Sequence, residues 1–200
     1  MNIHPYLAAA SVDMVGLANY LDHLDAATRL REVRSLGTRE QVTLFEAAAG
    51  PRPISLDHFV PTGTPPLREV VHYGRNSLPA FHDFEKRFCL PDLGGDELWG
   101  YNEHALKALT GPGYFVVRET RNPEMVIDYT QIPPRKPDKW PPILPNSARF
   151  GRFVYYQTRD IVRAVSEHVT VGRDTRNGRS LDRWFVLCRA DDASGIVPAG

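Results

Sequence analysis

Histidines are the side chains of this chain best suited to acid–base or metal chemistry, but their spacing forms no recognised site. No two of the seven are three or four residues apart, so a metal site could only be assembled by the tertiary fold. The chain also lacks G-x-S-x-G, H-E-x-x-H, C-x-x-C and phosphate-loop patterns. We therefore expect no metal and no cofactor.

His168 is the strongest catalytic candidate, because SEHVTVGR places it at the start of an apparent strand. If its side chain points into the fold, it could meet Asp128 or Tyr129 from a neighbouring strand and act as an acid or base. The simpler interpretation is a strand-end histidine in solvent.

Several large side chains near the predicted strands are candidate ligand-binding residues. Aromatic residues at this density fit the wall of a pocket, but they fit a filled core equally well. An inward-facing arginine would need a partner or a ligand anion, whereas an outward-facing one is a solvated charge. The candidate set is Tyr129, Trp140, Tyr155, Arg163, His168 and Trp184.

The composition is that of an ordinary globular protein. The 24 basic and 24 acidic side chains cancel, so no global field favours nucleic acid. Two distant cysteines, Cys89 and Cys188, suggest buried thiols in a reducing compartment, with one disulfide between them as the alternative. The first residues resemble neither a signal peptide nor a membrane span, so we expect a cytoplasmic protein.

The first fifty residues predict helices. Ser11 can cap a helix over 12–24, and Asp25 can cap one over 26–36. Thr38 and Gln41 have capping-box spacing before a third helix that ends at Gly50.

The middle of the chain reads as mixed helix and loop. The run 67–74 is ambiguous between a strand and a helical turn. Residues 76–88 predict a helix, because their large apolar residues follow helical spacing. A short helix is expected over 103–109.

From Gly113 the pattern changes to short runs rich in Val, Ile, Tyr and Phe, which predict antiparallel strands. The turn residues Arg121-Asn122-Pro123 separate the first two runs. Asn177-Gly178 is the strongest hairpin signal, because both residues tolerate the positive φ of a type I′ turn. The predicted strands cover 114–119, 124–132, 152–158, 161–165, 168–174 and 182–189.

The segment 132–146 holds six of the chain's seventeen prolines together with Ile132, Trp140, Ile143 and Leu144. It lies between two predicted strands of one sheet and is too apolar for a solvated linker. We expect an ordered loop over one end of the sheet, acting as a lid with Trp140 at least partly buried. A polyproline ligand for another protein, with a P-x-x-P-x-K pattern at 134–139, is the alternative.

Residues 124–189 resemble the calycin-like barrels, which include lipocalins and fatty-acid-binding proteins, and more narrowly the small bacterial GXWXG-type barrel proteins. The resemblance is carried by MVIDYTQIP, by RAVSEHVTVGR and its hairpin, and by RWFVLCR; LWGYN at 98–102 is the fragment nearest to GXWXG itself. It implies an α+β fold in which N-terminal helices precede an antiparallel β-meander that closes into a barrel. As one domain, 1–200 would comprise a helical cap (1–50), mixed helix and loop (51–112), barrel strands (113–190) and a tail (191–200).

Three functions remain open at this point. The first is a lipid-binding type of barrel that holds a small apolar or amphipathic molecule under the 132–146 lid. The second is an acid–base enzyme that uses His168 with Asp128 or Tyr129. The third is an interaction or assembly protein with a filled core. A small molecule is the expected partner, a homodimer is a further option, and nucleic acid is not expected.

Overall fold

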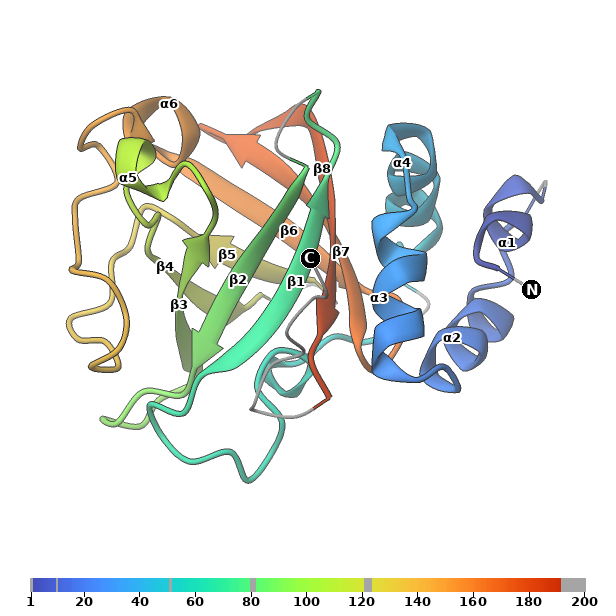
Figure 1. Ribbon diagram of the computed structural model, residues 1–200, viewed down its shortest axis with the longest axis horizontal. Helices are drawn as coiled ribbons and strands as arrows, with labels where there is room; N and C mark the ends of the chain where they lie inside the picture. The colour runs from blue at the N-terminus through green and yellow to red at the C-terminus, as the bar shows by residue number, and fades with distance from the viewer. Residues whose placement is uncertain (1, 10, 51, 80–81, 121–123, 192–200) are drawn as a thin grey trace.

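The computed structural model describes residues 2–9, 11–50, 52–79, 82–120 and 124–191 (Figure 1). Its centre is a closed barrel of eight antiparallel strands, in which each strand pairs with the next and β1 pairs with β8. The α+β fold with a barrel-closing meander is therefore confirmed. The strands are β1 (Val70–Asn76), β2 (Asp83–Cys89), β3 (Glu97–Glu103), β4 (Phe115–Glu119), β5 (Met125–Asp128), β6 (Thr158–Ala164), β7 (Val169–Arg176) and β8 (Arg179–Arg189).

The barrel begins at Val70, well before Gly113. The structure also corrects two predictions of secondary structure. The predicted helix over 76–88 is wrong, because Asp83–Cys89 is strand β2. Phe84, Lys86 and Phe88 alternate along it, and pairing with both β1 and β3 overrides the local helical spacing. The predicted strand over 152–158 is also wrong, since helix α6 (Gly151–Val154) and a turn precede β6.

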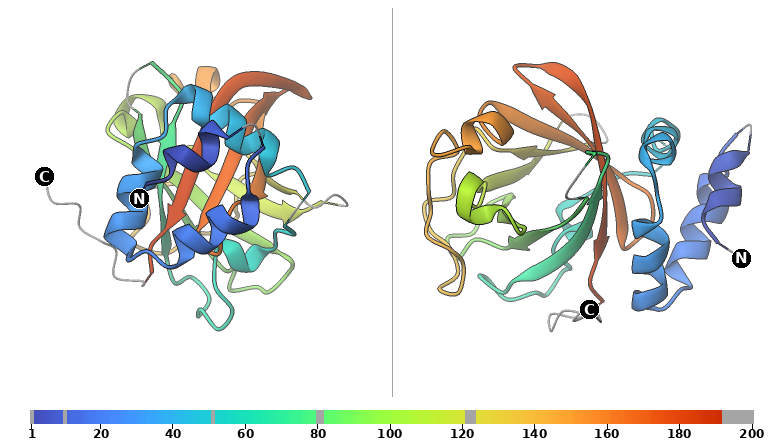
Figure 2. Two further views of the ribbon diagram at one scale, coloured as in Figure 1. Left: turned by 90° about the vertical axis from the view of Figure 1, so that its right-hand side faces the viewer. Right: turned by 45° about the horizontal axis from the view of Figure 1, so that its top comes forward.

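Four helices form a layer beside the barrel: α1 (His4–Ala8), α2 (Met14–Asp22), α3 (Ala26–Arg34) and α4 (Thr38–Ala47). Figure 2 shows α3 and α4 against the side of the barrel and α1 and α2 beyond them, so the helices do not cover either end. Apolar side chains of the helices pack on outward-facing residues of β1, β7 and β8, among them Val71, Val171 and Val186. The helices thus shield one wall of the sheet from water.

Local capping explains where these helices start. Asp25 caps α3 as predicted, with Oδ1 accepting a hydrogen bond from Thr28 N at 3.0 Å. Asp13 caps α2 in place of Ser11, and Glu40 accepts a hydrogen bond from Gly37 N at the start of α4.

Inside the barrel, three phenylalanine rings lie over glycines of the neighbouring strand. Gly74 faces Phe84, Gly100 faces Phe115 and Gly172 faces Phe185 in register. A Cβ at any of these glycines would lie 2.2–2.5 Å from a ring atom, so only glycine admits the rings.

The two ends of the barrel differ. At one end, Phe59 follows the short helix η1 (Leu56–His58) and packs with Phe88 and with His72, whose Nε2 is 2.9 Å from the Phe59 carbonyl oxygen. Burial lowers the pKa of His72 to about 3, so this ring is neutral. The other end is bordered by the short helices α5 (Lys107–Thr110) and α6. The expected helix over 103–109 is thus partly found in α5.

The hairpin between β7 and β8 is confirmed. Asn177 and Gly178 have φ of 51° and 74° and separate the paired residues Arg176 and Arg179. Positive φ at both central positions is what a type I′ turn requires. The predicted turn at 121–123 and most of the tail lie outside the described residues.

Cys89 and Cys188 are both buried and free, as expected. Among the described residues, no helix is long and apolar enough to cross a membrane.

The proline-rich loop packs on the outer wall of the barrel. Trp140 is buried as predicted, against Tyr101 and Tyr114 of the wall, and its Nε1 donates to Glu69 Oε2 at 2.6 Å. Asn146 ends the segment by donating to the carbonyl oxygens of Tyr114 and Tyr129. The contacts of Trp140 therefore lie on the side of the barrel.

Replacing Trp140 by Ala should lower the free energy of unfolding by about 3 kcal/mol, the usual cost of truncating a buried large aromatic side chain. Trp140→Phe is the matched control, because it keeps most of the ring packing and loses mainly the hydrogen bond to Glu69, worth about 1 kcal/mol. Urea denaturation of both variants measures the difference. Equal and negligible losses would show that the loop is not packed as described.

Candidate functional site

The candidate site is a cavity of about 250 Å³ at the α5–α6 end of the barrel. Its wall is largely apolar, with Leu78, Phe84, Leu106, Val154 and Phe185. Its polar lining comes from six strands and the adjoining segments: Asn76, Asp83, Lys86, Asn102, His104, Thr110, Tyr129, Tyr155, Thr158, Asp160, Asp174 and Arg183. This combination of an apolar wall with converging polar groups is typical of small-molecule sites.

A buried lysine forms the floor of the cavity. The Lys86 side chain is only 3% exposed, and Nζ donates to Asn102 Oδ1 at 3.0 Å, to Asp160 Oδ2 at 3.1 Å and to Tyr129 Oη. These three bonds use all the donors of the ammonium group. Nζ also lies 5.0 Å from the ring centroids of Tyr129 and Phe185, within cation–π range.

Strand alternation places these groups inside the barrel. On β6, Asp160 shares the inward face with Val162 and Ala164, which belong to the internal apolar cluster. Asp174 of β7 is the register partner of Asp160 across the antiparallel pair. Directly opposed residues have their Cβ atoms about 5 Å apart, so two carboxyl groups meet at the floor.

The two carboxyl groups cannot both ionise easily at this distance. Burial raises the pKa of Asp160, and the Lys86 ammonium opposes that rise. Burial and the neighbouring Asp160 carboxylate raise the pKa of Asp174 to about 8. Asp160 Oδ1 is buried and accepts no hydrogen bond from an N–H or O–H group of the described residues, and a protonated Asp174 can supply one. We infer that the pair carries one proton near neutral pH.

Two further groups border the cavity above this floor. Arg183 of β8 lies close enough to Asp174 to favour its ionised form, and within the described part of the chain it forms no ion pair. His104 Nε2 lies 2.8 Å from Tyr155 Oη, and burial lowers the pKa of this histidine. The cavity therefore offers a cation, a proton-sharing carboxyl pair and a tyrosine hydroxyl.

The structure places three of the predicted ligand-binding residues on this cavity: Tyr129, Tyr155 and Trp184. Trp140 lies on the outer wall. Arg163 also points outward, where its guanidinium stacks on Phe45 of α4 at 4.0 Å and pairs with Glu124.

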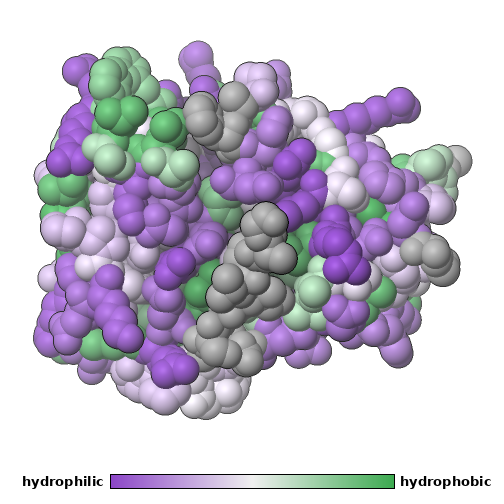
Figure 3. Space-filling view, in the orientation of Figure 1, coloured by the Kyte–Doolittle hydropathy of each residue, from purple (hydrophilic) through white to green (hydrophobic). Residues whose placement is uncertain are grey.

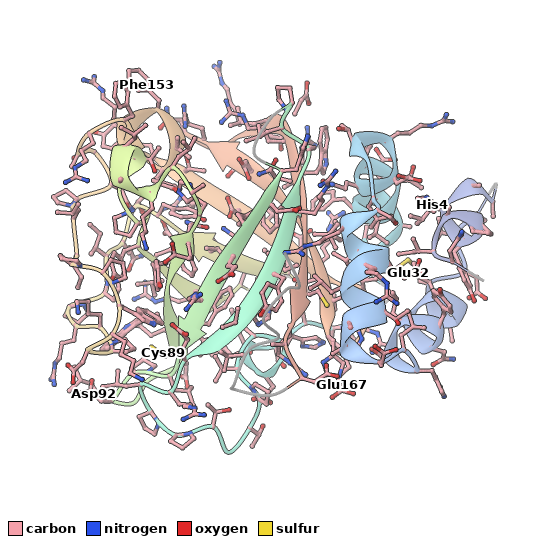
Figure 4. All side chains as sticks on the ribbon, in the orientation of Figure 1. His4, Glu32, Cys89, Asp92, Phe153 and Glu167 are labelled. Carbon is pink, nitrogen blue, oxygen red and sulfur yellow. The ribbon has the colours of Figure 1, made fainter. Side chains whose placement is uncertain are left out.

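His168 lies at the other end of the barrel, where its Nδ1 is 3.3 Å from Asp191 Oδ1. Figure 4 shows this separation, because the adjacent residue Glu167 lies far from Phe153 of α6. Asp128 pairs with Arg159 at the opposite end of β6, so the structure does not bring His168 and Asp128 together.

Sequence reasoning missed the floor itself. The signal was a charged residue flanked at i±2 by apolar ones, as in Phe84-x-Lys86-x-Phe88, which marks an inward-facing charge on a strand. Asp160-x-Val162-x-Ala164 carries a related signal, a charged residue followed at i+2 and i+4 by apolar ones. The predicted helix over 76–88 hid the first signal, and the predicted strand over 161–165 began one residue after Asp160, whereas β6 begins at Thr158.

A second hollow, of about 550 Å³, lies between the ends of the proline-rich loop and the Asn177–Gly178 hairpin. Its lining includes Thr130, Asn146 and Arg159, and it lacks the lysine–carboxyl floor. Within the described part of the chain, no group of three or more His, Cys, Asp or Glu residues could hold a metal ion. No family model and no curated protein matches this sequence.

The shared proton predicts how stability depends on pH. Asp174 binds a proton in the folded state between about pH 4 and 8, whereas the unfolded chain has lost it. The stability from this proton is thus fully present below about pH 4 and lost as the pH rises to about 8. Asp174→Asn keeps the hydrogen-bond donor without the titration. Its free energy of unfolding, relative to wild type, should increase with pH by up to about 1.4 kcal/mol per unit.

Urea denaturation of both proteins at pH 5, 6.5 and 8 measures this difference. Asp182→Asn, on the same hairpin but with a side chain 90% exposed, is the control and should follow wild type at every pH. Parallel curves for wild type and Asp174→Asn would contradict the shared proton.

Proposed function

We propose that this protein binds a small, mainly apolar molecule that carries one oxygen-containing polar group, and that it holds this molecule in the α5–α6 cavity. The observation that supports this most is the pairing of an apolar wall with a single polar floor in one hollow of a barrel. The closed antiparallel barrel preceded by helices is consistent with the calycin-like resemblance, whose members hold ligands inside the barrel.

The volume of the cavity limits the size of the ligand. A cavity of about 150 Å³ accommodates benzene, so about 250 Å³ suits a ligand of roughly ten non-hydrogen atoms. Burial of such a ligand against Phe84, Leu106 and Phe185 would supply most of the affinity, at about 25 cal/mol for each Å² of apolar surface.

The floor selects the polar group. All donors of Lys86 are used, and the proton of the carboxyl pair is shared between Asp174 and Asp160, so Arg183 is the charged donor left for the ligand. A guanidinium donor suits an acceptor such as a carbonyl oxygen. A carboxylate ligand would bring a second negative charge beside the Asp160 carboxylate, so we propose that a neutral carbonyl compound binds better than the corresponding acid.

Helices α5 and α6 form the rim through which this ligand would pass. Leu109, Phe150 and Phe153 are 56–62% exposed there, and Figure 3 shows the resulting apolar surface at the upper left, over α5 and α6. No residue of 132–146 lines the cavity, so in this proposal the proline-rich loop supports the wall and the rim helices take the role of the lid.

Titration with three compounds of one carbon skeleton, 2-octanone, 2-octanol and octanoate, tests this proposal by calorimetry at pH 7. The ketone should bind, and octanoate should bind at least tenfold more weakly because of the carboxyl pair. Val154→Trp, at the mouth of the cavity, should weaken ketone binding at least tenfold, whereas Val15→Trp on α2, also exposed, should not. A ligand site in this cavity would be contradicted if none of the three compounds binds. It would also be contradicted if Val154→Trp and Val15→Trp bind the ketone equally tightly.

A further inference from the structure

We propose that Asp174 is a general base that removes a proton from the carbon next to the carbonyl group of the bound ligand, and that Arg183 stabilises the enolate oxygen that forms. This inference rests on the proposed function, because the reaction requires a ketone in the α5–α6 cavity. It adds a chemical activity, proton transfer at a carbonyl compound, to the binding site.

The position of Asp174 suits a base. Asp174 lines the cavity and is less deeply buried than Asp160. Asp160 Oδ2 accepts hydrogen bonds from Lys86 Nζ and Tyr129 Oη. The groups that set the ionisation of Asp174 are Asp160 of β6, Lys86 of β2 and Arg183 of β8. Burial and the neighbouring Asp160 raise the pKa of Asp174 to about 8. A carboxylate with a raised pKa is a stronger base than an exposed carboxylate, and part of it is still ionised near neutral pH.

Arg183 supplies the positive charge that the reaction needs. When the carbon loses its proton, negative charge moves to the carbonyl oxygen. A fixed cation beside that oxygen in a largely apolar cavity stabilises this charge more than water does. Asp83 and His104 also line the cavity, but Asp83 pairs with Arg75 at 3.2 Å and His104 is kept neutral by burial.

The step is balanced without a second substrate. The Asp174 carboxylate takes the proton, the electrons of the C–H bond form the C=C bond of the enolate, and the electrons of the C=O π bond move to the oxygen beside Arg183. Return of a proton from Asp174 to carbon restores the ketone. If the ligand has a neighbouring double bond, the proton can return two carbons away, which isomerises an unconjugated ketone to a conjugated one.

Hydrogen–deuterium exchange of 2-tetralone, a ketone of suitable size, tests this inference. The protein is incubated with 2-tetralone in D₂O at pD 6 to 9, and loss of the α-proton signals is followed by NMR against buffer alone. Wild type should accelerate exchange on the order of a hundredfold, a usual contribution of a positioned base. The acceleration should grow as Asp174 ionises.

Asp174→Asn should lose at least tenfold of this acceleration while binding 2-tetralone within about threefold of wild type. Arg183→Gln should also lose at least tenfold, and its pD profile should move to higher pD, because Arg183 favours the ionised form of Asp174. Asp182→Asn on the same hairpin should leave exchange unchanged. Far-ultraviolet circular dichroism confirms that each variant is folded, and the binding constant of each variant sets the 2-tetralone concentration that gives equal occupancy.

The outcomes separate the two proposals. If wild type binds 2-tetralone but exchange equals that in buffer, or if Asp174→Asn exchanges as fast as wild type, the catalytic inference is wrong and the binding function stands. If wild type does not bind 2-tetralone, the proposed ketone site fails, and the catalytic inference fails with it.

Discussion

The interior of this barrel is organised around one constraint, the burial of the Lys86 ammonium. A charge in a medium of low polarity is costly unless it is paired and hydrogen-bonded, and removing one partner of such a pair typically costs about 3–5 kcal/mol. Asn102 of β3, Asp160 of β6 and Tyr129, the residue after β5, meet this requirement. Lys86 therefore ties β2, β3 and the β5–β6 region together at one level of the barrel.

The same constraint gives the cavity its chemical character. Asp160 forms an ion pair with Lys86. Because Asp174 is buried next to the Asp160 carboxylate, its pKa is raised, and the pair retains a proton near neutral pH. The floor is then close to neutral overall, with a donor and an acceptor available on one side and aromatic rings on the other. In the proposed function, such a hollow would distinguish ligands by their polar group more than by their shape. At the opposite end of the barrel, the interior is filled by the packed rings of Phe59, Phe88 and His72.

Sequence patterns identified the architecture better than the site. Alternation of β-branched and aromatic residues and the Asn177-Gly178 turn predicted an antiparallel meander after Gly113, because both act over short distances, while closure into a barrel was implied by the calycin-like resemblance. Residues 83–89 of the helix expected over 76–88 form strand β2 instead. A closed barrel requires each strand to pair on both sides, and the pairing of β2 with β1 and β3 outweighs the helical spacing of its apolar residues. The burial of Trp140 also followed from its apolar surroundings.

The site could not be assembled from the sequence because its parts are far apart along the chain. Lys86 and Asp160 are 74 positions apart, and only strand order and register bring them together. Tyr129, Tyr155 and Trp184 were predicted from aromatic density and do line the cavity. His168 was predicted from its side-chain chemistry and its position at the start of a strand, and that strand begins at the other end of the barrel.

A double-mutant cycle between Lys86 and Asp160 tests the organising role of the buried ammonium most directly. Lys86→Met alone leaves the Asp160 carboxyl without its cation, and Asp160→Asn alone leaves the ammonium without its anion. Each should lower the free energy of unfolding by about 3 kcal/mol or more. The double variant should be more stable than the sum of the single losses implies, by at least about 2 kcal/mol. Losses that add within about 0.5 kcal/mol would contradict the account.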